Sequence, residues 1–176
     1  MKIMIASDIH GSEYYLKNLL ERFKEERVDK LFLLGDILYH GPRNDLPKEY
    51  NPKGVVEALN RISSKVLSVR GNCESEVDQM VLNFPVMAEY MSLWIDGVEM
   101  FLIHGHNIPD SVKRGVVISG HTHIPVWNEC DGYIHLNPGS VSIPKENSCH
   151  SYMTYEDKTF LWKDVETGEV YKELKI

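Results

Sequence analysis

Apolar and polar positions in the first half of the chain follow two patterns, one typical of buried strands and one typical of amphipathic helices. Continuous apolar runs bounded by turn residues predict strands of a parallel sheet, and three occur here: residues 2–7, 30–34 and 65–69. Apolar residues at i, i+3 and i+4 spacing predict helices between these strands: residues 12–27 and 52–62. The strand–helix–strand order predicts a right-handed βαβ unit.

From residue 74 onward, hairpins replace this alternation. Asp96-Gly97 and Asp131-Gly132 are two-residue turn signals that each lie between two predicted strands. The predicted elements are a short helix at residues 74–82 and strands at residues 86–95, 98–103, 116–119, 126–129, 133–136, 151–155, 159–165 and 169–174. Helices in the first half and hairpins in the second predict an α/β (α+β) fold of two packed sheets with helices outside. Because no repeat or linker interrupts the pattern, we expect a single domain over residues 1–176.

The predicted loop after the second strand is unusually long. It runs over residues 37–53 and contains Gly41, Pro42, Pro47 and Pro52. Loops of this length in a compact domain are usually functional. We therefore expect this loop to overhang a site at the end of the second strand and to influence substrate choice.

The charge balance limits the class of partner. The chain has 19 Lys and Arg against 26 Asp and Glu, a formal net charge of −7, and 43% of its residues are hydrophobic. An acidic chain is unlike proteins with a broad basic groove for nucleic acid, so no nucleic-acid partner is expected. A small phosphorylated substrate stays possible because bound divalent metals reverse the local charge.

The cysteines and the N-terminal residues favour a reducing compartment such as the cytoplasm. Cys73, Cys130 and Cys149 are an odd, scattered set that does not resemble a disulfide framework. Met1-Lys2 runs directly into the first predicted strand, and no apolar run approaches the ~20 residues of a membrane span. We expect a soluble cytoplasmic protein without a signal peptide or a membrane partner.

Five predicted strands end at side chains that could bind metal: Asp8 and His10, Asp36, Asn72, His104, and His121 and His123. Carboxylate and amide oxygens mixed with imidazole nitrogens suit Mn, Fe, Ni or Zn better than Ca or Mg. Seven residues are too many for one ordinary site, but they divide into two groups of four if one carboxylate bridges. Two metals about 3.5–4 Å apart can hold a hydroxide and bind both sides of an in-line displacement at phosphorus. We therefore predict one two-metal site with Asp36 at its centre.

The same residues resemble a known family. Asp8-x-His10, Gly35-Asp36, Gly71-Asn72, His104 and Gly120-His121-x-His123 occur in the order typical of the calcineurin-like metallophosphoesterase superfamily. The resemblance covers residues 1 to about 145. Residues 41–44, 69–80 and 137–145 are similar to the small bacterial YfcE-type phosphodiesterases within that superfamily. The resemblance implies a four-layer α/β/β/α sandwich of two mixed sheets and a two-metal phosphoesterase that often depends on Mn.

Residue roles follow from the resemblance. The first metal would be held by Asp8, His10, Asp36 and His123, and the second by Asp36, Asn72, His104 and His121. Asp36, Asn72, Cys73 and His104 would take part in catalysis. Most members carry a histidine after Gly71-Asn72 that contacts the phosphate, but this chain has Cys73, as the YfcE-type group does. The identity of the leaving-group acid is therefore left open.

Each of these residues also has an ordinary structural interpretation. Singly, Asp8 could cap the following helix, and Asp36 and Asn72 could be turn residues, but their joint occurrence favours a metal site. We expect His106 to support a ligand or to cap a helix rather than to bind metal. Arg43 could fix its loop through a local ion pair, the interpretation we favour, or could bind a phosphate. Ordinary roles are expected for the remaining candidates: His40, His135, His150, Cys130, Cys149, the turn at residues 137–140, Trp94, Trp127 and Trp162.

The sequence therefore predicts a metal-dependent phosphodiesterase acting on a small phosphoester. Two divalent ions are expected, with Mn favoured over Fe, Ni, Zn and Mg. A phosphomonoesterase of the same fold is the close alternative. A non-catalytic scaffold is another, because a retromer subunit with this fold acts in protein–protein interaction. A nuclease is disfavoured by the charge of −7, and a homo-oligomer is possible.

Overall fold

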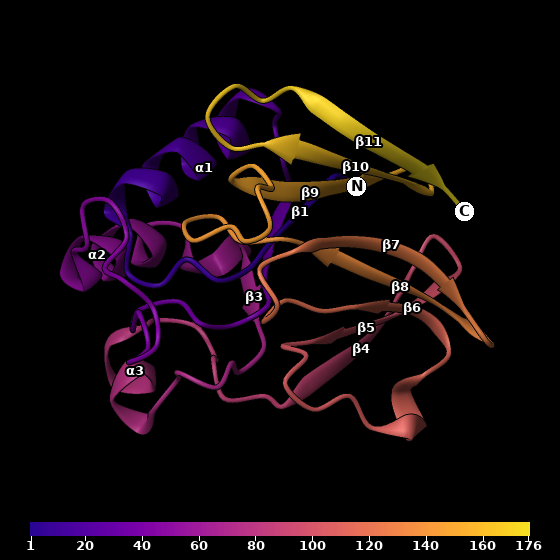
Figure 1. Ribbon diagram of the computed structural model, residues 1–176, viewed down its shortest axis with the longest axis horizontal. Helices are drawn as coiled ribbons and strands as arrows, with labels where there is room; N and C mark the ends of the chain where they lie inside the picture. Colours follow the sequence, from indigo (N-terminus) through magenta and orange to yellow (C-terminus); the bar gives the residue numbers. More distant parts are fainter.

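Two mixed sheets lie face to face in the computed structural model, which describes residues 1–176 (Figure 1). The first sheet has six strands in the order β11 (Val170–Lys175), β10 (Thr159–Asp164), β9 (Ser151–Glu156), β1 (Ile3–Ala6), β2 (Lys30–Leu33) and β3 (Val66–Ser68). The second has five in the order β4 (Tyr90–Ile95), β5 (Val98–Ile103), β6 (Gly115–Ile118), β8 (Tyr133–Pro138) and β7 (Pro125–Cys130). The expected fold class is confirmed.

The predicted parallel βαβ unit is present. β1 pairs in parallel with β2, and β2 pairs in parallel with β3. Helices α1 (Glu13–Glu25) and α2 (Pro52–Asn60) connect these strands, and the short α3 (Glu76–Val81) follows β3. Ser12 caps α1 by accepting a hydrogen bond from the Tyr15 backbone N–H, and Asn51 caps α2 in the same way.

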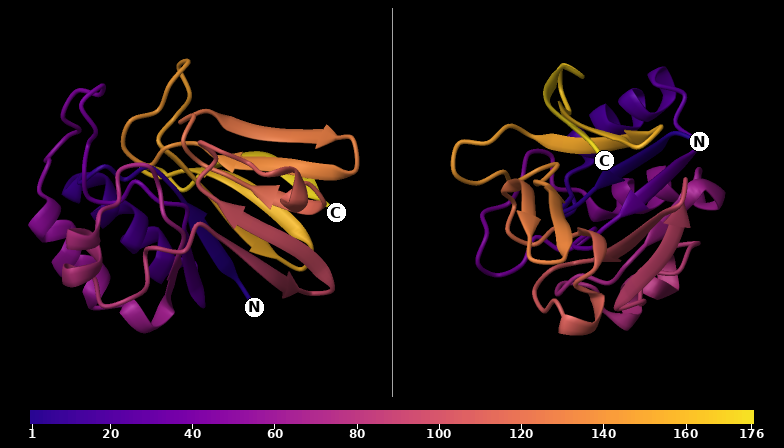
Figure 2. Two further views of the ribbon diagram at one scale, coloured as in Figure 1. Left: turned by 90° about the horizontal axis from the view of Figure 1, so that it is seen from below. Right: turned by 90° about the vertical axis from the view of Figure 1, so that its right-hand side faces the viewer.

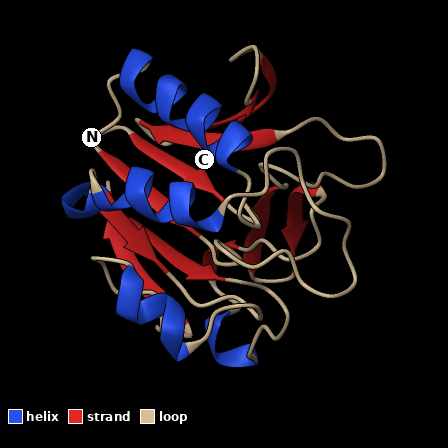
Figure 3. Cartoon of the chain, turned by 90° about the vertical axis from the view of Figure 1, so that its left-hand side faces the viewer, coloured by secondary structure: helices blue, strands red, loops and turns tan.

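Alternating side chains of the first sheet divide the core into two layers. Met4 and Ala6 on β1 pack against α1 and α2 on the outer face of the sheet (Figure 3). Ile3 and Ile5 point the other way and pack against the second sheet. Both faces of this sheet are buried, which explains why its parallel strands have continuous apolar sequences.

The outer layer on the second sheet is small. It consists of the 3-10 helix η2 (Asp110–Val112) and the segment around it, and Val112 packs on Phe101, Ile103 and Val117. A second 3-10 helix, η1 (Ser63–Lys65), lies directly before β3. The four layers are therefore unequal, with all three α-helices on the side of the first sheet.

The predicted strand at residues 86–95 is shorter than expected, because β4 begins only at Tyr90. Two preceding backbone groups bind partners outside any strand. The Val86 N–H donates to the Gln79 side chain, and the Ala88 carbonyl accepts from the Arg70 N–H. Side-chain and cross-sheet hydrogen bonds thus replace strand pairing over this segment.

The carboxyl ends of the parallel strands open onto one edge of the sandwich. The long loop after β2 and the loop before β9 project from this same end (Figure 2). The His104 ring also joins the two sheets here, since its Nδ1–H donates to the Leu34 carbonyl at 2.7 Å. None of the helices is both long and apolar enough to cross a bilayer.

Candidate metal centre

The structure brings the seven candidate metal ligands together at this edge. Five are buried: Asp8, His10, Asp36, His104 and His123. Asn72 is exposed and His121 is half-buried, so these two face the opening of the site. The residues come from five strand ends of two different sheets, and the convergence expected from the sequence is therefore present.

One group of donors surrounds Asp8. The Asp8 Oδ1 atom lies 3.3 Å from His123 Nε2 and 3.6 Å from His10 Nε2. The two Nε2 atoms are 3.2 Å apart. The donor atoms of these three residues lie within 4.8 Å of one another, close enough to surround a single ion.

A second group lies on the His104 side. His104 Nε2 is 3.0 Å from Asn72 Oδ1 and 3.2 Å from His121 Nδ1. The second group therefore uses the Nδ1 atom of His121, whereas the other three histidines direct Nε2 inward. The main chain places the His121 ring, because its backbone N–H donates to Asp8 Oδ2 at 3.0 Å.

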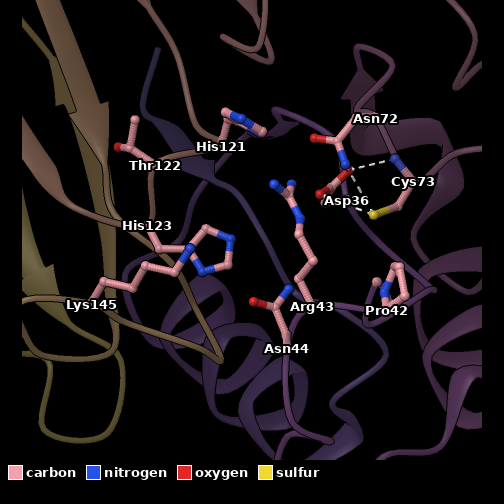
Figure 4. Close-up of a pocket in the computed structure, with 11 residues that line it drawn as sticks. Asp36, Pro42, Arg43, Asn44, Asn72, Cys73, His121, Thr122, His123 and Lys145 are labelled. Carbon is pink, nitrogen blue, oxygen red and sulfur yellow. Dashed lines mark hydrogen bonds between the residues drawn. The ribbon is translucent and has the colours of Figure 1, made fainter.

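Asp36 lies between the two groups and directs one oxygen toward each. Its Oδ2 atom is 3.7 Å from His10 Nε2, and its Oδ1 atom is 3.5 Å from His104 Nε2. Oδ1 also accepts a hydrogen bond from the Cys73 backbone N–H at 2.9 Å (Figure 4). This is the arrangement expected of a carboxylate that could bridge two ions.

Backbone carbonyls determine which ring nitrogen of three histidines faces the site. The Nδ1 atom of His10 lies 2.8 Å from the Tyr39 carbonyl. The Nδ1 atom of His104 lies 2.7 Å from the Leu34 carbonyl, and that of His123 lies 2.6 Å from the Ile143 carbonyl. A carbonyl only accepts, so each Nδ1 carries a proton. In the neutral ring Nε2 then has a free lone pair, as a metal ligand requires.

The donors fit divalent metal ions. Asp8 Oδ1 is buried without a hydrogen-bond partner, which is costly unless a cation or another donor approaches it. The 3.2 Å contact between the His10 and His123 Nε2 atoms places two lone pairs against each other when both rings are neutral. Carboxylate oxygens and imidazole nitrogens are suitable ligands for transition metals. A cation inside each group would satisfy all of these atoms.

The charges of these groups strongly influence one another. Burial raises the pKa of Asp8, but the neighbouring imidazoles of His10, His123 and His104 lower it by more, so the net pKa lies well below its usual range. Burial lowers the pKa of His104, but Asp36 and Asp8 raise it to about 9. In the metal-free protein this site therefore favours ionised carboxylates with a protonated His104.

The turns that carry the ligands have unusual backbone geometry. Five of the ligand residues have φ between 49° and 68°: Asp8, His10, Asp36, His121 and His123. Such left-handed residues are uncommon and cluster at functional sites. Two glycines allow the close packing: a Cβ on Gly71 would collide with the Asp36 carboxylate, and a Cβ on Gly120 would collide with Ser7.

Sequence reasoning missed the residues that hold these turns. The buried Glu74 carboxylate accepts hydrogen bonds from the backbone N–H groups of Asp36, Ile37 and Gly71 at 2.9, 2.7 and 2.5 Å. It thus joins the turns after β2 and β3. Its position two residues after Asn72 was visible in the sequence, but only a buried environment distinguishes it from a surface glutamate.

The turn at residues 137–140 has a similar supporting role. The Ser140 and Ser142 hydroxyls both donate to the Asp8 carbonyl, at 2.8 and 3.1 Å. The Asn137 side chain donates to the Gly120 carbonyl at 2.8 Å, directly before His121. This segment therefore fixes two ligand-bearing turns at once, which agrees with a structural turn beside the site.

Cys73 lies at the edge of the site, as its place after Asn72 suggested. Its Sγ atom donates to Asp36 Oδ2 at 3.3 Å. Burial raises the pKa of the Cys73 thiol, and the negative charge of Asp36 raises it further. The group is therefore a neutral thiol in the metal-free protein, and it lines the cavity in front of Asp36.

The other histidines lie outside the two groups. His106 is exposed, and its ring centroid is 5.6 Å from that of His104 and 6.0 Å from that of His121. His135 bonds the Ser119 hydroxyl, and His150 stacks on Tyr15. Of the tryptophans, Trp162 is in the core, whereas Trp94 and Trp127 are exposed.

A cavity of about 390 Å³ opens in front of the metal centre (Figure 4). Its wall includes Asp36, Asn72, Cys73, His121 and His123. The long loop after β2 contributes residues 41–44, and the loop before β9 contributes Lys145. The expectation that the long loop overhangs the site is confirmed. Arg43 makes no ion pair in the structure, so the local ion pair that we favoured is wrong.

The family and its relatives agree with this geometry. The family described as calcineurin-like phosphoesterase superfamily domain matches residues 1–159. Phosphodiesterase YfcE of Escherichia coli (strain K12) is 47% identical over 157 residues, which cover 86% of this chain and 85% of the relative. A phosphodiesterase of Methanocaldococcus jannaschii is 25% identical over 166 residues, or 88% of this chain and 87% of that protein.

Solved structures show the same fold. The phosphoesterase YfcE from E. coli superimposes with a TM-score of 0.94 at 42% identity, and the match covers 100% of both chains. Vps29 from Entamoeba histolytica matches with a TM-score of 0.67 at 20% identity over 100% of this chain and 99% of that one, which is a likeness of fold alone. The expected resemblance, fold and enzyme class are confirmed, and this chain belongs to the calcineurin-like phosphoesterase superfamily.

Proposed function

We propose that this chain is a metal-dependent phosphodiesterase that hydrolyses a small phosphodiester. The proposal is supported by the two donor groups that share Asp36, by the cavity in front of them, and by the names of the relatives. The cavity volume of about 390 Å³ is suitable for a metabolite-sized ligand. Small phosphoesters are therefore the substrate class that we propose.

The ligand roles proposed for the site follow its two groups. Asp8, His10, Asp36 and His123 would hold one ion, and Asp36, Asn72, His104 and His121 would hold the other. When bound, such ions would supply positive charge for the phosphate oxygens and would lower the pKa of water enough to provide a hydroxide nucleophile. We propose Mn as the preferred ion, because mixed oxygen and imidazole ligands suit it better than Mg.

The protein's own groups position these parts. Asp36 keeps the two donor groups next to each other, and the three carbonyl-bound histidines keep their Nε2 lone pairs directed inward. Asn72 and His121 are the more exposed ligands, so a phosphate entering from the cavity reaches their side of the centre first. Cys73 would face the leaving group, where a thiol is only a weak donor.

The position of Asp36 between the two groups carries the proposal, and metal replacement tests it. Protein stripped with a chelator would be reloaded separately with Mn, Fe, Ni, Zn or Mg, and its metal content measured. Hydrolysis of bis(para-nitrophenyl) phosphate and of para-nitrophenyl phosphate would then be compared. We expect two ions per chain and faster turnover of the diester. Faster turnover of the monoester would instead favour the phosphomonoesterase, and no turnover with any metal would favour a scaffold.

We also propose that the enzyme works in the cytoplasm. Cys73, Cys130 and Cys149 are all free thiols in the structure, as suits a reducing compartment. Fractionation of cells that produce the protein, followed by detection in the soluble cytosolic fraction, tests this location.

A further inference from the structure

Two cationic side chains reach the cavity without any partner in the protein. Arg43 and Lys145 both line it, together with Asp36, Asn72 and His123. Neither side chain makes an ion pair or a hydrogen bond with the protein, so both are available to an anion in the cavity. In a chain with a net charge of −7, two free cations at one cavity are a local reversal of charge.

The two side chains approach the cavity from different loops. Arg43 extends from the loop after β2, and Lys145 extends from the loop before β9 (Figure 4). Figure 4 shows the Arg43 guanidinium directed toward the space between Asp36 and His123, with the Lys145 side chain running beside His123. The cations therefore lie on two sides of one space next to the metal centre.

Hydrogen bonds hold the backbone at Lys145 and next to Arg43. The Lys145 N–H donates to the carbonyl of His123 at 3.2 Å, and the Lys145 carbonyl accepts from the Ser148 hydroxyl at 2.7 Å. In the other loop, the Asn44 side chain donates to the His40 carbonyl at 2.8 Å. Binding of an anion would therefore have to order the two side chains but not the backbone that carries them.

The charge balance of the site indicates which anion. Two divalent ions carry four positive charges, and Asp8 with Asp36 contributes two negative charges. A simple phosphodiester has one negative charge and a hydroxide has another, so the two ions, the two carboxylates, the diester and the hydroxide together have no net charge. The positive charges of Arg43 and Lys145 are then more than a simple diester needs for neutrality. They match a substrate that carries a further negatively charged group.

The rest of the wall disfavours a nucleobase. The lining is almost entirely polar, and no Trp, Tyr or Phe side chain is part of it. Bases stack on aromatic rings or guanidinium planes, and the only rings that line this cavity are the imidazoles of His121 and His123, which the proposed metal sites use. A small polar substituent with its own charge fits this wall better.

We propose that Arg43 and Lys145 form a second anion-binding subsite, which selects phosphodiesters that carry an additional phosphate or carboxylate. This inference rests on the proposed phosphodiesterase function and specifies its substrate class. Arg43 can bind such a group with two parallel hydrogen bonds, and Lys145 adds a second positive charge.

A pair of matched substrates tests the subsite. One is para-nitrophenyl propyl phosphate, and the other carries a terminal phosphonate on the propyl chain, so both have the same leaving group. We expect the enzyme loaded with Mn to prefer the phosphonate ester by about tenfold in kcat/KM. Arg43→Ala and Lys145→Ala should each reduce this ratio, the double variant should abolish it, and Lys145→Glu should reverse it. Arg61→Ala and Lys175→Ala remove the same charges away from the cavity and should preserve the ratio.

Binding gives a readout that does not require turnover. The corresponding methyl esters lose methoxide slowly, so their dissociation constants can be measured by calorimetry on the protein loaded with Mn. Preference for the phosphonate-bearing ester that disappears in the double variant supports the subsite, even if neither nitrophenyl ester is hydrolysed and the proposed function fails. Hydrolysis of both esters with the same ratio in the wild type and the double variant overturns the subsite and leaves the proposed function intact.

Discussion

The Nε2 atoms of His10 and His123 lie 3.2 Å apart, although a backbone carbonyl binds the Nδ1–H of each ring. Neither neutral ring can then donate a hydrogen bond to the other. The contact is favourable only when a cation or an additional proton lies between or beside the two nitrogens. Metal ions and protons therefore compete for the same lone pairs, and several of the following predictions depend on this competition.

Removal of metal should abolish activity. Chelation followed by desalting leaves the cavity with two carboxylates facing the phosphate, which repel it. We expect diester hydrolysis to be lost, and Mn to restore it better than Mg because imidazole ligands disfavour Mg. Colorimetric assay together with elemental analysis measures both quantities. Undiminished hydrolysis by protein shown to be free of metal would contradict the two-metal mechanism.

Metal binding should release protons near neutral pH. Burial lowers the pKa of His104, but Asp36 and Asp8 raise it to about 9 in the metal-free protein, so its imidazole is protonated at pH 7. This raised pKa stabilises the metal-free fold below pH 6.5, and the contribution is lost as pH rises through 9. Because a ligand must be neutral, metal affinity should increase over the same range.

Calorimetry in buffers with different ionisation enthalpies counts the released protons. We expect on the order of one proton per chain at pH 7 and close to none above pH 10. His135→Gln serves as a control, since His135 bonds Ser119 outside the donor groups and its replacement should not alter the count. A proton count that does not change with pH would show that His104 is already neutral.

Asp36→Asn should impair both metal sites. The substitution removes the charge that lies next to His10 on one side and His104 on the other. We expect less than one ion per chain and a fall in kcat of about 1,000-fold, or ~4 kcal/mol of lost transition-state stabilisation. Asp45→Asn, in the exposed part of the same loop, is the matched control. A variant that retains two ions and normal turnover would exclude Asp36 as the bridge.

Glu74→Ala should destabilise the fold and disturb the site together. Loss of the carboxylate leaves the backbone N–H groups of Asp36, Ile37 and Gly71 buried without an acceptor. We expect the free energy of unfolding to fall by about 3 kcal/mol, with weaker metal binding as well. Urea unfolding of the metal-free protein measures the first effect separately. Glu76→Ala is the control, because Glu76 is exposed. Equal losses of stability in the two variants would contradict the proposal that Glu74 holds the turns of the site.

Cys73→His should change how the rate depends on the leaving group. The thiol that faces Asp36 is a weak donor, so the native enzyme should show a steep dependence of rate on leaving-group pKa. An imidazole can protonate the leaving oxygen, and general acids contribute about 10²–10⁴-fold. We expect a flatter dependence and a shifted ratio of monoester to diester hydrolysis. If Cys73→Ala and Cys73→His both keep the native slope and ratio, Cys73 only fills space beside Asn72.

Local patterns in the sequence were sufficient for most of the fold. Continuous apolar runs identified β1, β2 and β3, because both faces of that sheet are buried. Asp96-Gly97 marked the turn between β4 and β5, because few residues adopt the required positive φ. The pairing of β1 with β9, which are far apart in the chain, follows from tertiary packing and has no local signal.

The chemistry of the site divides in the same way. The sequence determined which donors are present, since Asp8, Asp36 and His123 each come shortly after an apolar run. Few other side chains at these positions could bind a metal ion. Only the tertiary structure decided that His121 faces its partners through Nδ1, that Glu74 holds the Asp36 turn, and that Arg43 has no ion pair. These features depend on distances between residues from different strands and loops. A one-dimensional pattern records the type of each side chain, whereas hydrogen bonding and burial depend on neighbours that only folding brings together.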